Sequence, residues 1–190
     1  MIRLLIFYFI FQFQFSYCQE REASLIFYDN TKVKGLGEIK NNIIYFRLSN
    51  TEKPEKWDYD IAKGLDFDGM GYHERYEYII TDTYKKPYLM EVIEEGFVNL
   101  YRDVSVINSS SGFGMTKNTV SLIQNSYYIK KQNEDKAFEL SLNFKKKAEK
   151  LFGDCKALME KINKKEFTSK NTLDIVHFYN DYCGEYEEED

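Results

Sequence analysis

The sequence predicts an α+β fold in which an N-terminal antiparallel β-meander, arranged as a sheet or a partly closed barrel, is followed by a C-terminal three-helix segment. From Ala23 to about Leu142, apolar residues alternate with a period near two, in runs that end at turn residues. After Asn143 the apolar period becomes helical. No internal repeat or linker interrupts the chain. We therefore expect a signal peptide at 1–18, a β-rich region at 19–142, a helical region at 143–184 and an acidic tail at 185–190.

The first half of the β-rich region has the pattern of consecutive hairpins. Its strands are expected at "ASLIFY", at Lys32–Lys40 and at "IIYFRL". Because asparagine tolerates positive φ, Asn41-Asn42 predicts a two-residue type I′ turn between the last two. The polar stretch "SNTEKPEKWDYD" contains Pro54 and predicts a loop, and "IAKGLDFDGMGY" predicts a short strand with a glycine-rich turn.

The second half continues the meander. "YEYIIT", "YLMEVI" and "FVNLYR" predict strands, and the last two flank Glu94-Glu95-Gly96, where Gly96 is expected to supply the positive φ of a hairpin turn. Val106–Asn118 is rich in serine and glycine and predicts a mobile surface loop. "SYYIKK" and "AFELSL" predict a final hairpin around Gln132–Lys136.

Three helices are expected after the strands. Asn143 is placed to cap the first, and Gly153 to end it. Asp154 is expected to cap the second, and the third is expected from about Thr172 to Tyr182, ending before Gly184. The apolar stripes of the first two helices are Phe144, Ala148, Leu151 and Phe152, and then Cys155, Leu158, Met159 and Ile162.

The N-terminus has the order of a secretory signal peptide. Arg3 is followed by an apolar stretch to about Phe15 and then by the small residue Ser16. The stretch is too short to span a membrane. We expect cleavage after Cys18, which leaves Gln19 first and the protein secreted or periplasmic. In the alternative, Cys18 is acylated and anchors the protein to a membrane.

The charge balance and the missing motifs narrow the function classes. The chain has 26 Lys+Arg and 31 Asp+Glu, a net charge of −5, which argues against a general nucleic-acid binder. The sequence contains no phosphate-binding loop, GxSxG nucleophile elbow or HExxH zinc motif. It therefore predicts neither a catalytic residue nor a cofactor.

The remaining cysteines predict a disulfide. With Cys18 removed, Cys155 and Cys183 form an even pair in an exported chain, at the start of the second expected helix and the end of the third. Closing a loop of about 29 residues would add roughly 3.6 kcal/mol to stability. The alternative is a redox pair or a metal site, although the spacing matches neither.

"DFDGMGYHERYE" partly matches a twelve-residue calcium loop. Asp66, Asp68 and Glu77 occupy ligand positions, but Met70 stands where an oxygen ligand belongs, and strands are expected where the motif requires helices. The sequence therefore leaves two interpretations of this segment: a divalent-cation site or a polar hairpin turn. Together with His73, Asp66 and Asp68 also allow a second reading, an envelope hydrolase that uses acidic residues.

Aromatic residues offer a different kind of site. Trp57 and Tyr59 lie in "KWDYDI", and such side chains either form a stacking surface for glycans or peptides or fill a half-buried sheet face. The chain also resembles uncharacterised secreted proteins of the Bacteroidota in "SYCQ", "EVIEEGFVNLYR", "SYYIKK", "LFGDCKALMEKI" and "IVHFYNDYC". That resemblance implies a β-rich body with a cysteine-bearing helical end in the bacterial envelope.

The first functional hypothesis is therefore an exported, non-enzymatic module that binds a protein or glycan partner. The second is the envelope hydrolase described above. The third is a structural assembly component, which would dock to a neighbour through the loop near Ser109 or through the acidic tail Glu185 to Asp190.

Overall fold

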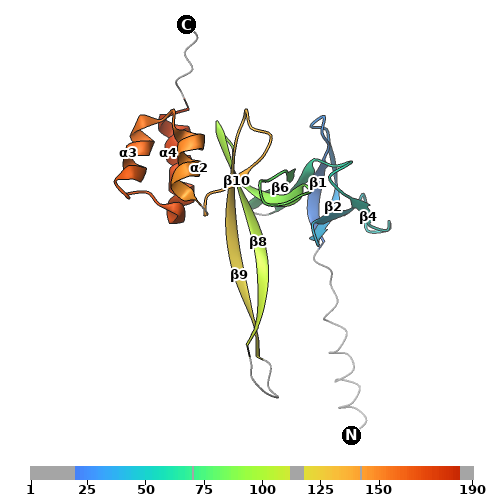
Figure 1. Ribbon diagram of the computed structural model, residues 1–190. Helices are drawn as coiled ribbons and strands as arrows, with labels where there is room; N and C mark the ends of the chain where they lie inside the picture. The colour runs from blue at the N-terminus through green and yellow to red at the C-terminus, as the bar shows by residue number, and fades with distance from the viewer. Residues whose placement is uncertain (1–19, 70, 112–117, 142, 185–190) are drawn as a thin grey trace.

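The computed structural model describes residues 20–69, 71–111, 118–141 and 143–184, and only the backbone of 104–111 and 118–124. It confirms the predicted α+β class: an open ten-stranded antiparallel sheet is followed by C-terminal helices (Figure 1). The strands are β1 (Arg21–Ile26), β2 (Lys32–Lys40), β3 (Ile43–Arg47), β4 (Glu55–Trp57), β5 (Gly64–Gly69), β6 (Tyr72–Ile79), β7 (Tyr88–Glu94), β8 (Val98–Ser111), β9 (Asn118–Lys131) and β10 (Phe138–Glu139).

The meander is interrupted once, at β1. The strand order is β10-β9-β8-β7-β6-β5-β1-β2-β3-β4, so β1 lies between β2 and β5. Leu25 of β1 is opposite Val33 on one side and Leu65 on the other. β4 pairs with β3 inside a stretch that was predicted to be a loop, which corrects that prediction. Pairing across the sheet makes this short segment a strand despite its polar sequence.

The predicted Asn41-Asn42 turn is confirmed, with φ of 51° and 64°. The side chain of Asn42 also accepts a hydrogen bond from the backbone N–H of Leu89 at 2.5 Å, which fixes the turn against β7. The predicted hairpin between β7 and β8 is present. Gly96 does not have a positive φ, so the prediction that it supplies the positive φ of the turn was wrong. A Cβ at Gly96 would lie 2.6 Å from Nδ2 of Asn180, so the glycine makes room for a side chain of the helical region.

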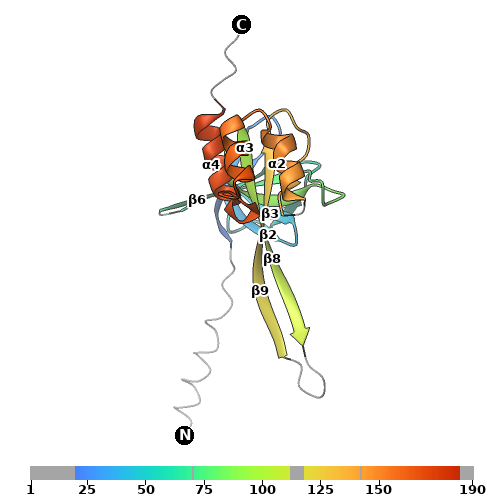
Figure 2. The ribbon, with the colours of Figure 1, turned by 60° about the vertical axis from the view of Figure 1, so that its left-hand side comes forward.

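The β8–β9 ribbon corrects the predicted loop at 106–118. The two strands pair in unbroken register from Val98↔Lys131 to Ser111↔Asn118. Residues 112–117 lie outside the described part. Figures 1 and 2 show that the far half of this ribbon projects beyond the body of the protein. We call the section formed by 104–111 and 118–127 the arm.

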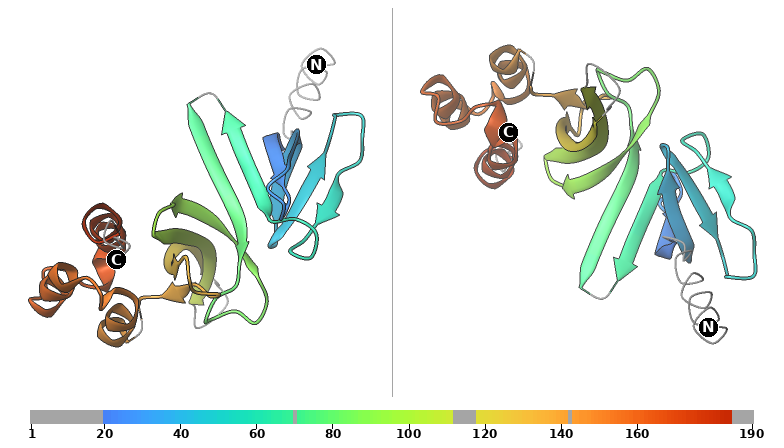
Figure 3. Two further views of the ribbon diagram at one scale, coloured as in Figure 1. Left: turned by 90° about the horizontal axis from the view of Figure 1, so that it is seen from above. Right: turned by 90° about the horizontal axis from the view of Figure 1, so that it is seen from below.

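The helices pack on one end of the sheet, and the β1–β4 strands lie at the other, with the β8–β9 ribbon between them (Figure 3). One buried cluster joins Val98, Leu100 and Ile129 of the ribbon to Phe152 and Val176 of the helices. A second cluster gathers side chains mainly from β1, β3 and β5, and a third gathers side chains from β6, β7, β8 and β9. The helices are α2 (Phe144–Phe152), α3 (Lys156–Asn163) and α4 (Thr172–Tyr182), with a short 3-10 turn, η2 (Ser169–Asn171), before α4.

The helix caps differ from the prediction. Asn143 has a φ of 54° and makes no side-chain cap, and the cap of α3 is Cys155 rather than Asp154. The Sγ atom of Cys155 accepts a hydrogen bond from the N–H of Leu158 at 3.4 Å. The disulfide between Cys155 and Cys183 is confirmed, with their Cα atoms 5.7 Å apart.

Asn180 of α4 docks the helical region onto the sheet. Its side chain accepts from the N–H of Val98 at 2.9 Å and donates to the carbonyl oxygen of the same residue at 3.0 Å. It also donates to Glu94 at 2.6 Å. Val98 is fully buried, so these bonds satisfy backbone groups that water does not reach. The helices are thereby fixed to the start of β8.

Candidate functional site

A groove of about 590 Å³ lies at the β4 end of the sheet, within the size range of ligand sites. Val33 and Leu48, both at the groove, have exposed fractions of 37% and 59%. Charged groups from Arg47, Glu52 and Lys53 also line it. Its apolar lining consists of Leu25, Phe27, Val33, Phe46, Leu48 and Trp57. The groove therefore has an apolar interior and charged groups of both signs.

Local sequence features explain how the groove forms. A Cβ at Gly35 of β2 would lie 2.6 Å from the ring of Phe46, so the glycine lets that ring lie across the strand. Trp57 is held because β4 pairs with β3, which places Trp57 opposite Ile44. Its ring meets Phe27 edge to face, with centroids 5.7 Å apart. The groove thus gathers side chains from four strand segments.

Two N–H groups of groove residues have no acceptor among the described residues: Nε of Arg47 and Nε1 of Trp57. The two terminal nitrogens of Arg47 are in use, because Nη1 donates to the carbonyl oxygen of Asn50 at 3.0 Å and Nη2 pairs with Glu20. An unpaired buried donor costs about 1–3 kcal/mol. Both nitrogen atoms have almost no exposed surface, so a ligand would reach them only if the surrounding side chains moved.

The structure separates the two aromatic residues of the predicted binding surface. Trp57 lines the groove. Tyr59 is not part of the lining. Like Trp57 it packs on the second cluster, and its ring lies edge to face with that of Tyr78, with centroids 6.1 Å apart. The hydroxyl of Tyr78 donates to the carbonyl oxygen of Trp57 at 3.0 Å, and burial raises the pKa of Tyr78 to about 12. Tyr59 and Tyr78 therefore support the strand that carries Trp57.

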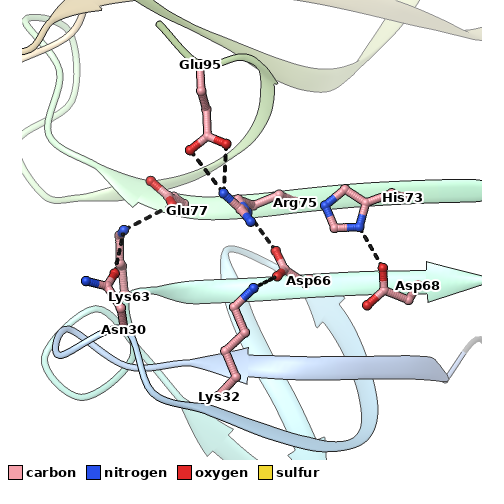
Figure 4. Close-up of polar contacts among 9 residues, drawn as sticks. All are labelled: Asn30, Lys32, Lys63, Asp66, Asp68, His73, Arg75, Glu77 and Glu95. Atoms are coloured by element: carbon pink, nitrogen blue, oxygen red, sulfur yellow. Dashed lines mark hydrogen bonds and ion pairs between the residues drawn. The ribbon is translucent and has the colours of Figure 1, made fainter.

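The acidic residues of the calcium-like motif lie on β5 and β6, and Figure 4 shows how each is paired. Asp66 is 1% exposed. Nζ of Lys32 lies 2.6 Å from one of its oxygens, and Nε of Arg75 lies 2.9 Å from the other. Arg75 also contacts both oxygens of Glu95, at 2.8 and 3.0 Å. Burial would raise the pKa of Asp66, but the hydrogen bonds from Lys32 and Arg75 outweigh burial and lower it.

The other residues of the motif are not brought together with Asp66. Asp68 pairs with His73 at 2.6 Å on the exposed part of the hairpin, and Glu77 lies 3.3 Å from Lys63. Strands flank the segment, whereas a calcium loop needs helices. Among the residues that the structure describes, no group of three or more His, Cys, Asp or Glu is placed to hold a metal ion. The arrangement supports a hairpin stabilised by ion pairs.

A second groove, of about 600 Å³, lies beside the disulfide Cys155–Cys183. Within it, Nζ of Lys131 is 2.6 Å from Asp154, and the hydroxyl of Tyr179 donates to the same oxygen at 2.7 Å. Burial would raise the pKa of Asp154, but these two hydrogen bonds outweigh burial and lower it. Asp154 is therefore ionised at neutral pH, and it links the start of α3 to β9.

Comparison with known protein families, curated proteins and solved structures finds no match to this chain. In the described residues, no helix is long and apolar enough to cross a membrane.

Sequence reasoning found Trp57 but missed the rest of the groove. Phe27 and Val33 have the ordinary pattern of strand residues, and Arg47 has that of a surface charge. What assembles them is the pairing of β1, β2, β3 and β4. The pair Gly35 and Gly37 within β2 was the one signal in the sequence, because glycine in a strand marks a close approach of other atoms.

Proposed function

We propose that this protein is an exported, non-enzymatic binding module whose groove at Trp57 takes an apolar side chain of a protein partner. The observation that carries the proposal is a groove lined by Trp57, in which the apolar side chains of Val33 and Leu48 are partly exposed. A side chain from a partner fills the groove and packs against Trp57 and the aliphatic walls. Charged residues at the groove set the orientation of the partner.

The lining favours a protein partner over a glycan. Leu25, Val33 and Leu48 are aliphatic, and aliphatic walls complement an apolar side chain better than the hydroxyl groups of a sugar. A glycan that stacks on Trp57 is the second candidate, which the test below separates from the first.

Trp57 is the only tryptophan in the chain, so its fluorescence reports on the groove selectively. We expect a peptide selected for binding from a random library to shift this emission to shorter wavelength, and Trp57→Ala to weaken binding by 2 kcal/mol or more, as for an aromatic hot spot, which is roughly thirtyfold in Kd. Leu173→Ala is the control, because Leu173 is 40% exposed on the distant helix α4. Binding to glycans alone, or equal losses in both variants, would contradict the proposal.

Export is the part of the proposal that concerns location. It is supported by the signal-like order of the first residues and by the disulfide. We expect the native exported protein to have the intact mass of a chain that starts at Gln19, and this mass to rise by about two daltons on reduction, as one disulfide takes up two hydrogens. A mass that corresponds to an acylated Cys18 would show a membrane-anchored lipoprotein instead.

A further inference from the structure

The arm has long strand edges that no described strand covers. β7 pairs with β8 only as far as Arg102, and β10 pairs with β9 only at Tyr128 and Ile129. Among the described strands, β9 therefore has no neighbour on its outer side from Asn118 to Tyr127. This edge is ten residues (127 − 118 + 1), longer than a typical whole strand of about five or six. Figures 1 and 2 show it away from the body.

The other sheet edges of this protein are protected in the ways that natural sheets use. The terminal strand β4 has three residues, follows Pro54 and carries Glu55 and Lys56. The terminal strand at the opposite end, β10, has only two residues. Short length, proline and charge each discourage another strand from pairing.

The arm has none of these protections. Between Val104 and Ser126, Lys117 is the only charged residue, whereas 30% of the whole chain is charged. The segment contains no proline, and it is rich in the β-branched residues and serines of "VSVINSSS" and "NTVSLIQNS". A long, uncharged and unpaired edge is a template for another strand.

We propose that the outer edge of β9, from Asn118 to Tyr127, pairs antiparallel with the same edge of a second copy of this chain, so that the protein is a two-fold symmetric dimer joined through its arms. An antiparallel edge is self-complementary under a two-fold axis, because each strand presents to its copy the donors and acceptors that it needs. The chain has a net charge of −5, so two copies repel each other overall. The uncharged arm is where that repulsion is least.

The first test is the oligomeric state. We expect the wild-type protein to dimerise below about 100 μM in sedimentation equilibrium, and the double variant Thr119→Lys/Ser121→Lys to weaken dimerisation about tenfold or more, because like charges then face each other across the paired edges. The matched control, Asn133→Lys/Asn163→Lys, adds the same charge at exposed positions away from the arm. A monomeric wild-type protein, or equal dimerisation in both variants, would overturn the proposal.

The second test does not depend on how well the lysine variant folds. Single cysteines are placed in turn at positions 119 to 125 of β9, and disulfide-linked dimers are measured under mild oxidation. Since antiparallel copies bring each residue opposite itself only near the two-fold axis, cross-linking should peak at one or two neighbouring positions. A uniform yield along β9, or none, would refute β9–β9 pairing. The proposal would also be refuted if the chain alone stayed monomeric and the edge bound a strand from a different protein.

Discussion

Asp66→Asn is expected to lower the free energy of unfolding by about 3 kcal/mol at neutral pH. The change keeps the size of the side chain but removes the negative charge between Lys32 and Arg75. Both cations then face a neutral amide. We place the loss at the low end for a buried pair because the side chain of Lys32 is 45% exposed and keeps part of its hydration. Urea unfolding monitored by circular dichroism measures the difference.

The pH dependence of this variant has a defined sign. Because the pKa of Asp66 is lowered in the folded state, its contribution is complete above the unfolded value of about 3.9 and is lost as pH falls through the folded pKa. The difference between wild type and Asp66→Asn should be constant near pH 7 and shrink below about pH 4. The control is Asp68→Asn. The side chain of Asp68 is 66% exposed, so this variant should change the free energy of unfolding by less than about 0.5 kcal/mol. Equal effects of the two variants would contradict the assignment.

Removing the disulfide should have an effect of similar size. We expect Cys155→Ala/Cys183→Ala to lower the free energy of unfolding by about 3.6 kcal/mol. The bridge joins residues 28 apart in the sequence, and without it the unfolded chain regains the conformational entropy of that loop. The bridge joins the start of α3 to the end of α4, and Asn180 of α4 holds the helices against Val98. Loss of the bridge therefore weakens the docking of the helical region.

Two spectroscopic probes can show which part of the protein loses stability when the disulfide is removed. Circular dichroism at 222 nm follows the helices, whereas the fluorescence of Trp57 follows the opposite end of the sheet. In the double variant we expect the helical signal to change at a lower denaturant concentration than the tryptophan signal. Reduced wild-type protein is the control and should behave like the variant. If removing the bridge left both transitions unchanged, the disulfide would have no stabilising role.

Much of the fold follows from local patterns. The Asn41-Asn42 turn was predictable because few residues other than asparagine and glycine accept positive φ at both positions of a type I′ turn. The third helix was predicted at Thr172–Tyr182 and is found there, because its apolar residues repeat at the helical period. The Cys155–Cys183 pair followed from counting cysteines and from their positions at helix ends.

The sequence by itself determined most of the strands, the helices and the pairing of the cysteines, because each depends on residues that are close in the chain or few in number. Only the tertiary structure decided the insertion of β1 between β2 and β5, the groove around Trp57 and the burial of Asp66 between Lys32 and Arg75. It also decided that the serine-rich stretch near Ser109 continues β8. The physical reason is the same in each case: these features arise from contacts between segments distant in sequence, and no local period records which segments will meet.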